Sequence, residues 1–148
     1  MLELLEAAAP AYLTTVDAEG YPHTRAMFNL HNLEQWPELE AFMAPAREEF
    51  VAYFSTNTSS PKVAHVRANP KACAYYCDPK EYRGLMLRGT VEIVDDRAVK
   101  EALWYEESKK YYPQGLDDPD YTVLRLRPAL AKYYAGLSVT ALELPEGK

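Results

Sequence analysis

The sequence contains few cysteines and no long hydrophobic run. Cys73 and Cys77 are the only cysteines, and we expect free thiols because their spacing is not that of a CxxC pair. No stretch approaches the roughly 18 apolar residues of a membrane span. The N-terminal residues "MLELLEAAAPAYL" carry glutamates where a secretory signal would be basic. We therefore expect a cytoplasmic protein with no membrane part.

Basic residues are also too few for a general nucleic-acid binder. The chain has 16 lysines and arginines against 22 acidic residues, a net charge of −6, whereas nucleic-acid binding usually needs a basic excess. No GxSxG motif is present, and neither cysteine lies in an activating context. The sequence therefore identifies no catalytic nucleophile, acid or base.

Histidines give little support for a metal site. The only three are His23, His31 and His65. The first two would lie roughly 26 Å apart along an extended strand, so they could share a metal only if the chain folded back. We expect no metal site and surface or hydrogen-bonded histidines instead.

The 148 residues are expected to form one domain, 1–148. Short apolar segments alternate with turn residues, which predicts a mainly β fold. We expect six or seven mostly antiparallel strands, two or three short helices, and a closed or partly open β-barrel. The expected helices cover 2–9, 61–69 and 97–112. The expected strands include a hairpin over 11–30 and strands over 49–56, 71–78 and 82–96.

The remaining segments are expected as follows. A bend or bulge should lie at Gly89. Residues 121–128, 130–136 and 138–144 have strand character. Residues 31–47 contain two prolines and should form an irregular excursion, with one helical turn near 38–42.

A hydroxyl-rich loop is the most informative segment. The six residues Ser55, Thr56, Asn57, Thr58, Ser59 and Ser60 separate an apolar strand from Pro61 and Lys62. Proline suits the first position of a helix. Hydroxyls and a lysine beside a helix N-terminus can bind an anion such as phosphate. The alternative is a solvated loop in which Ser60 caps the helix.

Arg25 is a second candidate, because it lies in a strand whose neighbours alternate toward a core. A half-buried arginine needs a partner or a route to water. A phosphate bound in bidentate fashion would satisfy it, and so would a carboxylate at the rim. Both possibilities stay open.

Four segments in order resemble the FMN-binding split β-barrel, the superfamily of pyridoxamine 5′-phosphate oxidase and the bacterial general stress proteins. They are "LTTVDAEGYPHTRAM", "FSTNTSSPKVAHVRANPKACAYY", "LRGTVEIVDD" and "DYTVLRLRPALAKYYAG". The resemblance implies that FMN is the cofactor and that the FMN phosphate is held by Arg25 and by the loop residues Ser55, Thr56, Ser60 and Lys62. It also implies that the backbone of Arg25, Ala26, Met27 and Phe28 runs along the flavin ring.

The resemblance further implies a homodimer with flavin at the subunit interface. Tyr134 and the loop 111–121 are the candidates for reaching the second subunit's flavin. Several positions depart from the oxidase pattern: Pro61 replaces a second basic residue, Leu30 replaces a lysine for the substrate's phosphate, and Gly84 replaces a glutamine. The C-terminal "LSVTALELPEGK" also lacks the oxidase's Arg-x-His.

The general stress protein branch is therefore the closer match, and we do not expect pyridoxamine phosphate oxidase activity. The expected function is an FMN-dependent oxidoreductase acting on an unidentified small molecule. Two alternatives stay open. One is a stress-related protein that holds flavin or haem without turnover, and the other is a relative that uses a deazaflavin.

Overall fold

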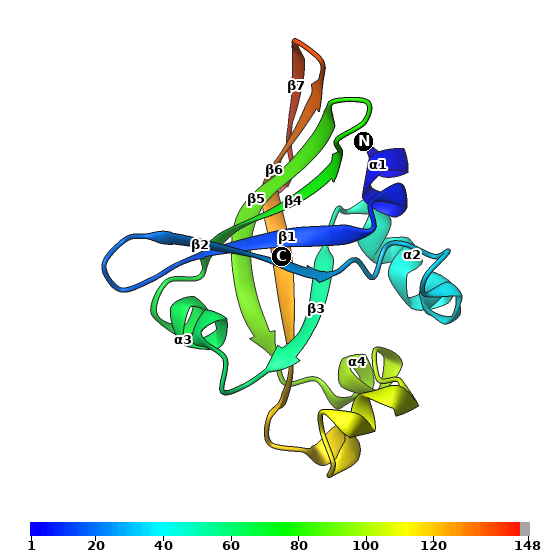
Figure 1. Cartoon of the computed structure of the whole chain (residues 1–148), viewed down its shortest axis with the longest axis vertical. Coiled ribbons are helices and arrows are strands. Elements are labelled where there is room, and N and C mark those ends of the chain that lie inside the picture. Colours follow the sequence, from blue (N-terminus) through cyan, green and yellow to red (C-terminus); the bar gives the residue numbers. More distant parts are fainter. Residues whose placement is uncertain (146–148) are drawn as a thin grey trace.

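The computed structural model describes residues 1–145 and has a mainly β architecture (Figure 1). The strands are β1 (Pro10–Val16), β2 (Pro22–Phe28), β3 (Ala52–Asn57), β4 (Lys71–Asp78), β5 (Arg83–Val94), β6 (Tyr121–Ala135) and β7 (Ser138–Glu143). The helices are α1 (Leu2–Ala7), α2 (Glu40–Glu48), α3 (Pro61–Ala68) and α4 (Arg97–Ala102). Three short 3₁₀ turns are η1 (Pro37–Leu39), η2 (Glu106–Lys110) and η3 (Gly115–Asp117).

All the strand pairings are antiparallel, in the order β2-β1-β4-β5-β6-β3, and β7 pairs with the C-terminal part of β6. β2 and β3 stand at the two ends of this order. They approach each other, but no strand pairing between them is found within residues 1–145. The barrel is therefore split at this point, and the predicted split β-barrel is confirmed.

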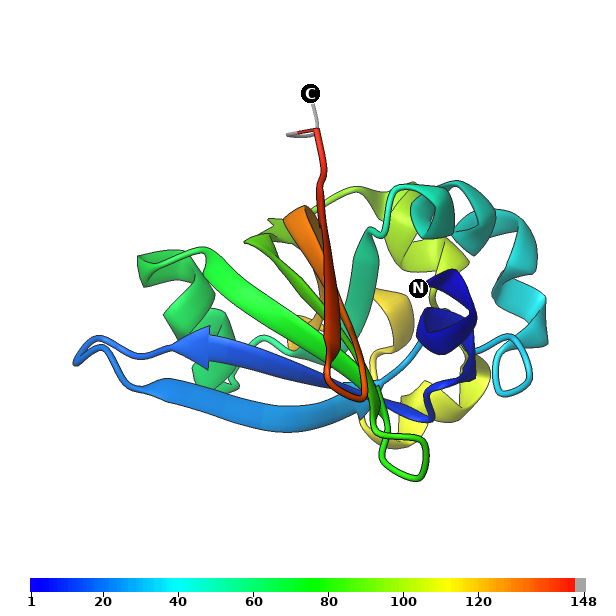
Figure 2. The same cartoon turned by 90° about the horizontal axis from the view of Figure 1, so that it is seen from above.

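The hairpin over 11–30 is also confirmed, and its turn explains its register. The Asp17 carboxylate accepts hydrogen bonds from the backbone N–H groups of Glu19 and Tyr21, both at 2.9 Å. Gly20 closes the turn with a φ of +90°, a conformation that glycine adopts without steric cost. This turn places Arg25 opposite Leu13. Figure 2 shows the hairpin extending past α3.

Two predictions about strand continuity are resolved at one bulge. The register between β5 and β6 shifts at Arg88 and Gly89, which confirms the bulge at Gly89. Residues 121–128 and 130–136 were expected as separate strands, but they form the single strand β6. Pro128 lies opposite Gly89, and a proline is tolerated inside a sheet at a bulge because the ladder is already interrupted.

β3 is buried on both faces, between two apolar clusters. Ala52 and Phe54 join the barrel interior with residues such as Leu13 and Leu87. Val51 and Tyr53 join a second cluster outside the barrel. A strand covered on both faces has a continuous apolar run in its sequence, which is the pattern seen at 50–54.

The irregular excursion expected over 31–47 is confirmed up to η1, but the single helical turn expected near 38–42 is too short, because α2 occupies Glu40–Glu48 with Pro45 inside the helix. Met43 and Ala46 of α2 are buried in the second cluster. Tertiary packing of this kind overrides a weak local propensity. The single helix expected over 97–112 is also wrong, because it breaks after α4 and Leu103 packs into the same cluster.

His31 ties the segment after β2 to the start of β3. It is 2% exposed, and its Nε2 donates to the Val51 carbonyl oxygen at 2.8 Å. Its Nδ1 is buried and has no partner among residues 1–145. Burial, together with the positive charge of Arg47, lowers the His31 pKa to about 4, although the hydrogen bond to Val51 opposes the shift.

We predict that His31 makes the fold sensitive to acid. Since its pKa is lower in the folded than in the unfolded chain, its neutral form stabilises the fold fully above pH 6.5. That stability is lost as the pH falls toward 4. Urea unfolding should show about 2 kcal/mol more loss between pH 7 and pH 5 for the wild type than for His31→Gln.

The matched control is His23→Gln, which removes an exposed histidine. This variant should lose at least as much stability between the two pH values as the wild type. An unchanged acid loss in His31→Gln would contradict the assignment.

Candidate functional site

Three of the predicted phosphate ligands meet where β3 ends and α3 begins. The Lys62 ammonium donates to Thr56 Oγ1 at 2.9 Å and to Ser60 Oγ at 3.1 Å. Ser60 occupies the N-cap position of α3, but its side chain makes no capping hydrogen bond. The hydroxyl that could have capped the helix therefore faces the lysine.

Arg25 reaches the same region from β2. Its Nη1 donates to the Leu13 carbonyl oxygen at 3.2 Å and to Thr15 Oγ1 at 2.8 Å. Thr15 Oγ1 lies 2.9 Å from His65 Nδ1 on α3. Because this hydroxyl already accepts from Arg25, its own proton is available to His65. The chain of contacts fixes Arg25 against α3.

The electrostatics of the two cations are unusual. Burial lowers the pKa of Lys62, and the positive charge of Arg25 lowers it further. Burial also lowers the pKa of Arg25. Within residues 1–145 neither side chain forms a salt bridge with a carboxylate. The carboxylate alternative for Arg25 is therefore not found in the described chain, and an anion would relieve the repulsion.

Asp120 holds the loop in shape from the other side. Its backbone carbonyl accepts from Thr58 N–H at 2.7 Å. Its carboxylate accepts from Ser59 N–H at 2.8 Å and from the Asn57 amide at 2.6 Å. These bonds attach the loop 111–121 to the hydroxyl-rich loop 55–60 of the same chain. Sequence reasoning had assigned this segment only to a second subunit.

A groove lies between β2 and β3, and its lining begins one residue along each strand from Arg25 and Thr56. It has a volume of about 440 Å³ and is lined by Ala9, Pro10, Ala26, Met27, Phe28, Gln35 and Ser55. That volume is within the range of small-molecule sites. The outer edge of β2 has no strand partner among the described residues, so alternate backbone N–H and C=O groups lie open there.

The structure thus brings together all but one of the predicted cofactor residues. Arg25, Thr56, Ser60 and Lys62 form the cationic end, whereas Ala26, Met27, Phe28 and Ser55 line the groove. Tyr134 is not among them. It lies on the part of β6 that pairs with β7, and β1, β4 and β5 separate β6 from β2 in the sheet (Figure 1).

Sequence reasoning missed Thr15, His65 and Asp120 as supports of this site. The hairpin register could have indicated Thr15, since Leu13 faces Arg25 and Thr15 points to the same side two residues on. The contact between Asn57 and Asp120 spans 63 residues, and no local pattern could have indicated it.

Other kinds of site find no support in the described chain. Within residues 1–145 no three His, Cys, Asp or Glu side chains gather as a metal site would require. Cys73 and Cys77 are free thiols, and burial raises the pKa of Cys73, which makes its thiolate scarce. None of the helices described in residues 1–145 has the length and hydropathy to span a membrane.

Comparison with known proteins gives a consistent family. Residues 1–135 match the family model described as pyridoxamine 5′-phosphate oxidase. A search of curated proteins found no match. Among solved structures, the chain resembles a Clostridium acetobutylicum protein described as related to general stress protein 26 of B. subtilis. The identity is 34% over 95% of this chain and 89% of that one, with a TM-score of 0.72.

Two further structures share the fold. The general stress protein 26 of Bacillus anthracis is 18% identical over 95% of this chain and 94% of its own, with a TM-score of 0.67. A protein described as F420 reductase is 25% identical over 87% of this chain and 93% of its own, with a TM-score of 0.56.

We predict that Lys62 serves binding rather than folding. In Lys62→Met the side chain keeps its length but loses the charge that Arg25 repels. The free energy of unfolding of the ligand-free variant should therefore lie within about 1 kcal/mol of the wild-type value, or above it. Inorganic phosphate should raise the Tm of the wild type, as a ligand of the folded state does, and should raise that of the variant less.

The control is Lys80→Met, which removes an exposed lysine from the turn between β4 and β5. Phosphate should stabilise this variant as much as it stabilises the wild type. Equal phosphate effects in all three proteins would contradict an anion site at Lys62.

Proposed function

The chain belongs to the pyridoxamine 5′-phosphate oxidase family, and from this premise we propose that it is an FMN-dependent oxidoreductase acting on a small molecule. The observation that carries the proposal is the pair of half-buried cations, Arg25 and Lys62, which lies beside a groove and has no carboxylate partner in residues 1–145.

The cationic end suits the phosphate of FMN. A phosphate dianion accepts several charge-assisted hydrogen bonds, and here one arginine, one lysine and two hydroxyls converge. The start of α3 adds a favourable dipole for negative charge. Pro61 contributes no N–H at this position, so Lys62 and Arg25 supply the formal charge that neutralises the phosphate.

The groove suits the ring of the cofactor. The open edge of β2 offers backbone donors and acceptors to the polar edge of a planar heterocycle, and Met27 and Phe28 offer apolar contact. When bound, FMN supplies the electron or hydride transfer, while the protein anchors and orients it. The described groove residues include no Asp, Glu, His, Lys or Arg, so the groove itself holds no proton donor or acceptor of that kind.

A homodimer would complete the site. β7 is exposed along its whole length, and the large apolar side chains Leu137, Val139 and Tyr82 are 105%, 58% and 81% exposed. Exposed apolar surface of this kind is typical of an interaction face. We propose that a second copy covers it and that Tyr134, on the neighbouring strand, reaches the partner's flavin.

A deazaflavin is the second candidate cofactor, favoured by the similarity to the protein described as F420 reductase. That cofactor also carries a phosphate, so Arg25 and Lys62 would serve it equally. A protein that only holds its cofactor is also compatible with a groove that lacks titratable side chains.

The test is gel filtration of the purified protein after incubation with FMN. The oxidised-flavin spectrum should elute with a dimer-sized peak, and Lys62→Met should weaken FMN binding about 10- to 100-fold. Lys80→Met should bind as the wild type does. Oxidation of a reduced nicotinamide by the loaded protein would separate an enzyme from a holding protein.

The proposal would be wrong if FMN left the wild type on the column at every concentration tested. If F420 were retained in its place, the phosphate site would stand with the other cofactor.

A further inference from the structure

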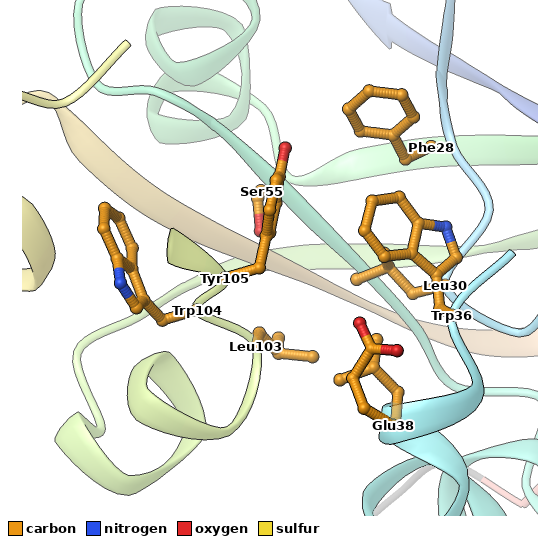
Figure 3. A pocket seen from close by; sticks show the side chains of 9 residues that line it. Phe28, Leu30, Trp36, Glu38, Ser55, Leu103, Trp104 and Tyr105 are labelled. Atoms are coloured by element: carbon orange, nitrogen blue, oxygen red, sulfur yellow. The ribbon is translucent and has the colours of Figure 1, made fainter. Parts of the chain in front are cut away.

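A small aromatic cavity opens beside the groove (Figure 3). Its volume is about 20 Å³, and its main lining residues are Phe28, Leu30, Trp36, Glu38, Trp104 and Tyr105. The segment after β2 forms one wall and the break after α4 forms the other. These two segments are the ones that sequence reasoning described least well.

Aromatic rings dominate the wall. The ring centroids of Phe28 and Trp36 lie 5.4 Å apart, and those of Trp36 and Tyr105 lie 5.3 Å apart. Both pairs are strongly inclined rather than stacked, at 65° and 57°. Several π systems at one small cavity attract a cation, and tryptophan attracts it most strongly.

The charge at the cavity also favours a cation. Glu38 is the one charged side chain among the described lining residues, and no salt bridge engages it within residues 1–145. Figure 3 shows its carboxylate turned toward the space between Trp36 and Leu103. Leu30 and Leu103 supply apolar wall. A phosphate or carboxylate entering here would meet a like charge and no described cation.

The cavity is continuous with the groove in its lining, because Phe28 and Ser55 border both. Its volume exceeds the roughly 10–15 Å³ that one water-sized group requires. An ammonium head fits that size, while the body of its molecule would extend into the 440 Å³ groove.

We propose that this cavity binds the head group of a small organic ammonium ion and so selects cationic, unphosphorylated substrates. As a statement about substrates, it rests on the proposed function, since the ligand's body would lie beside the cofactor. Glu38 and the rings of Phe28, Trp36 and Tyr105 recognise the charge, and Glu38 repels anionic groups.

The chain offers a direct optical readout. Trp36 and Trp104 are its only two tryptophans, and both line the cavity. Intrinsic tryptophan fluorescence of the FMN-free protein therefore reports occupancy of the cavity. The purified full-length protein would be titrated at pH 7 with benzylamine, benzyl alcohol and benzoate, which share a ring but differ in charge.

Benzylammonium should bind about tenfold more tightly than benzyl alcohol, and benzoate should bind most weakly. Glu38→Gln should weaken benzylammonium about three- to fivefold and leave benzyl alcohol unchanged. The matched control is Glu40→Gln, which changes an exposed acid at the start of α2 that is not part of the described lining. It should leave all three affinities unchanged.

Equal affinities for the three probes, tightest binding of benzoate, or no change in fluorescence with any probe would overturn the proposal. FMN binding would be measured by gel filtration on the same preparation, which separates the two hypotheses. Selective benzylammonium binding by a protein that does not bind FMN would support the cavity and refute the flavin function. Tight FMN binding without cation selectivity would refute the cavity alone.

Discussion

The repulsion between two half-buried cations is the constraint around which the candidate site is organised. Arg25 and Lys62 come from different elements, and each has a pKa lowered by burial. Several contacts hold them together against that cost: Thr15 and the Leu13 carbonyl for Arg25, and Thr56 and Ser60 for Lys62. Neither cation has a carboxylate partner within residues 1–145, which is the basis for proposing an anionic ligand here.

The split in the barrel supplies the rest of the site. β3 is covered on both faces by apolar clusters, so it is firmly placed. β2 pairs only with β1 and keeps one edge free in the described sheet. The groove lies between this fixed strand and the open edge. Phe28 and Ser55 line both the groove and the aromatic cavity, and Trp36 and Trp104 of the cavity pack against the second cluster. The same packing that stabilises α2 therefore also shapes the ligand space.

The predictable parts of the site were local in sequence. Thr56, Ser60 and Lys62 lie within seven residues, and the chemistry of a hydroxyl-rich loop before a helix identifies them. Arg25 was found because an arginine among alternating apolar residues needs an explanation. The hairpin and the bulge at Gly89 were found from turn and strand chemistry in the same way.

The parts that could not be predicted depend on contacts between distant segments. Asp120 holds the hydroxyl-rich loop through a hydrogen bond to Asn57, which lies 63 residues earlier in the sequence. α2 forms despite Pro45 because Met43 and Ala46 are buried. Local helix propensity cannot indicate this burial, because it depends on tertiary packing. The aromatic cavity joins Trp36 to Tyr105 across the fold, so neither residue alone indicated it.

The most direct test of the central claim is the ratio of affinities for FMN and riboflavin, which differ only by the phosphate. If Arg25 and Lys62 form the anion site, FMN should bind at least about 100-fold more tightly than riboflavin, since two charge-assisted contacts are involved. Equal affinities for the two flavins would contradict the account, because the cation pair would then contribute nothing to the cofactor.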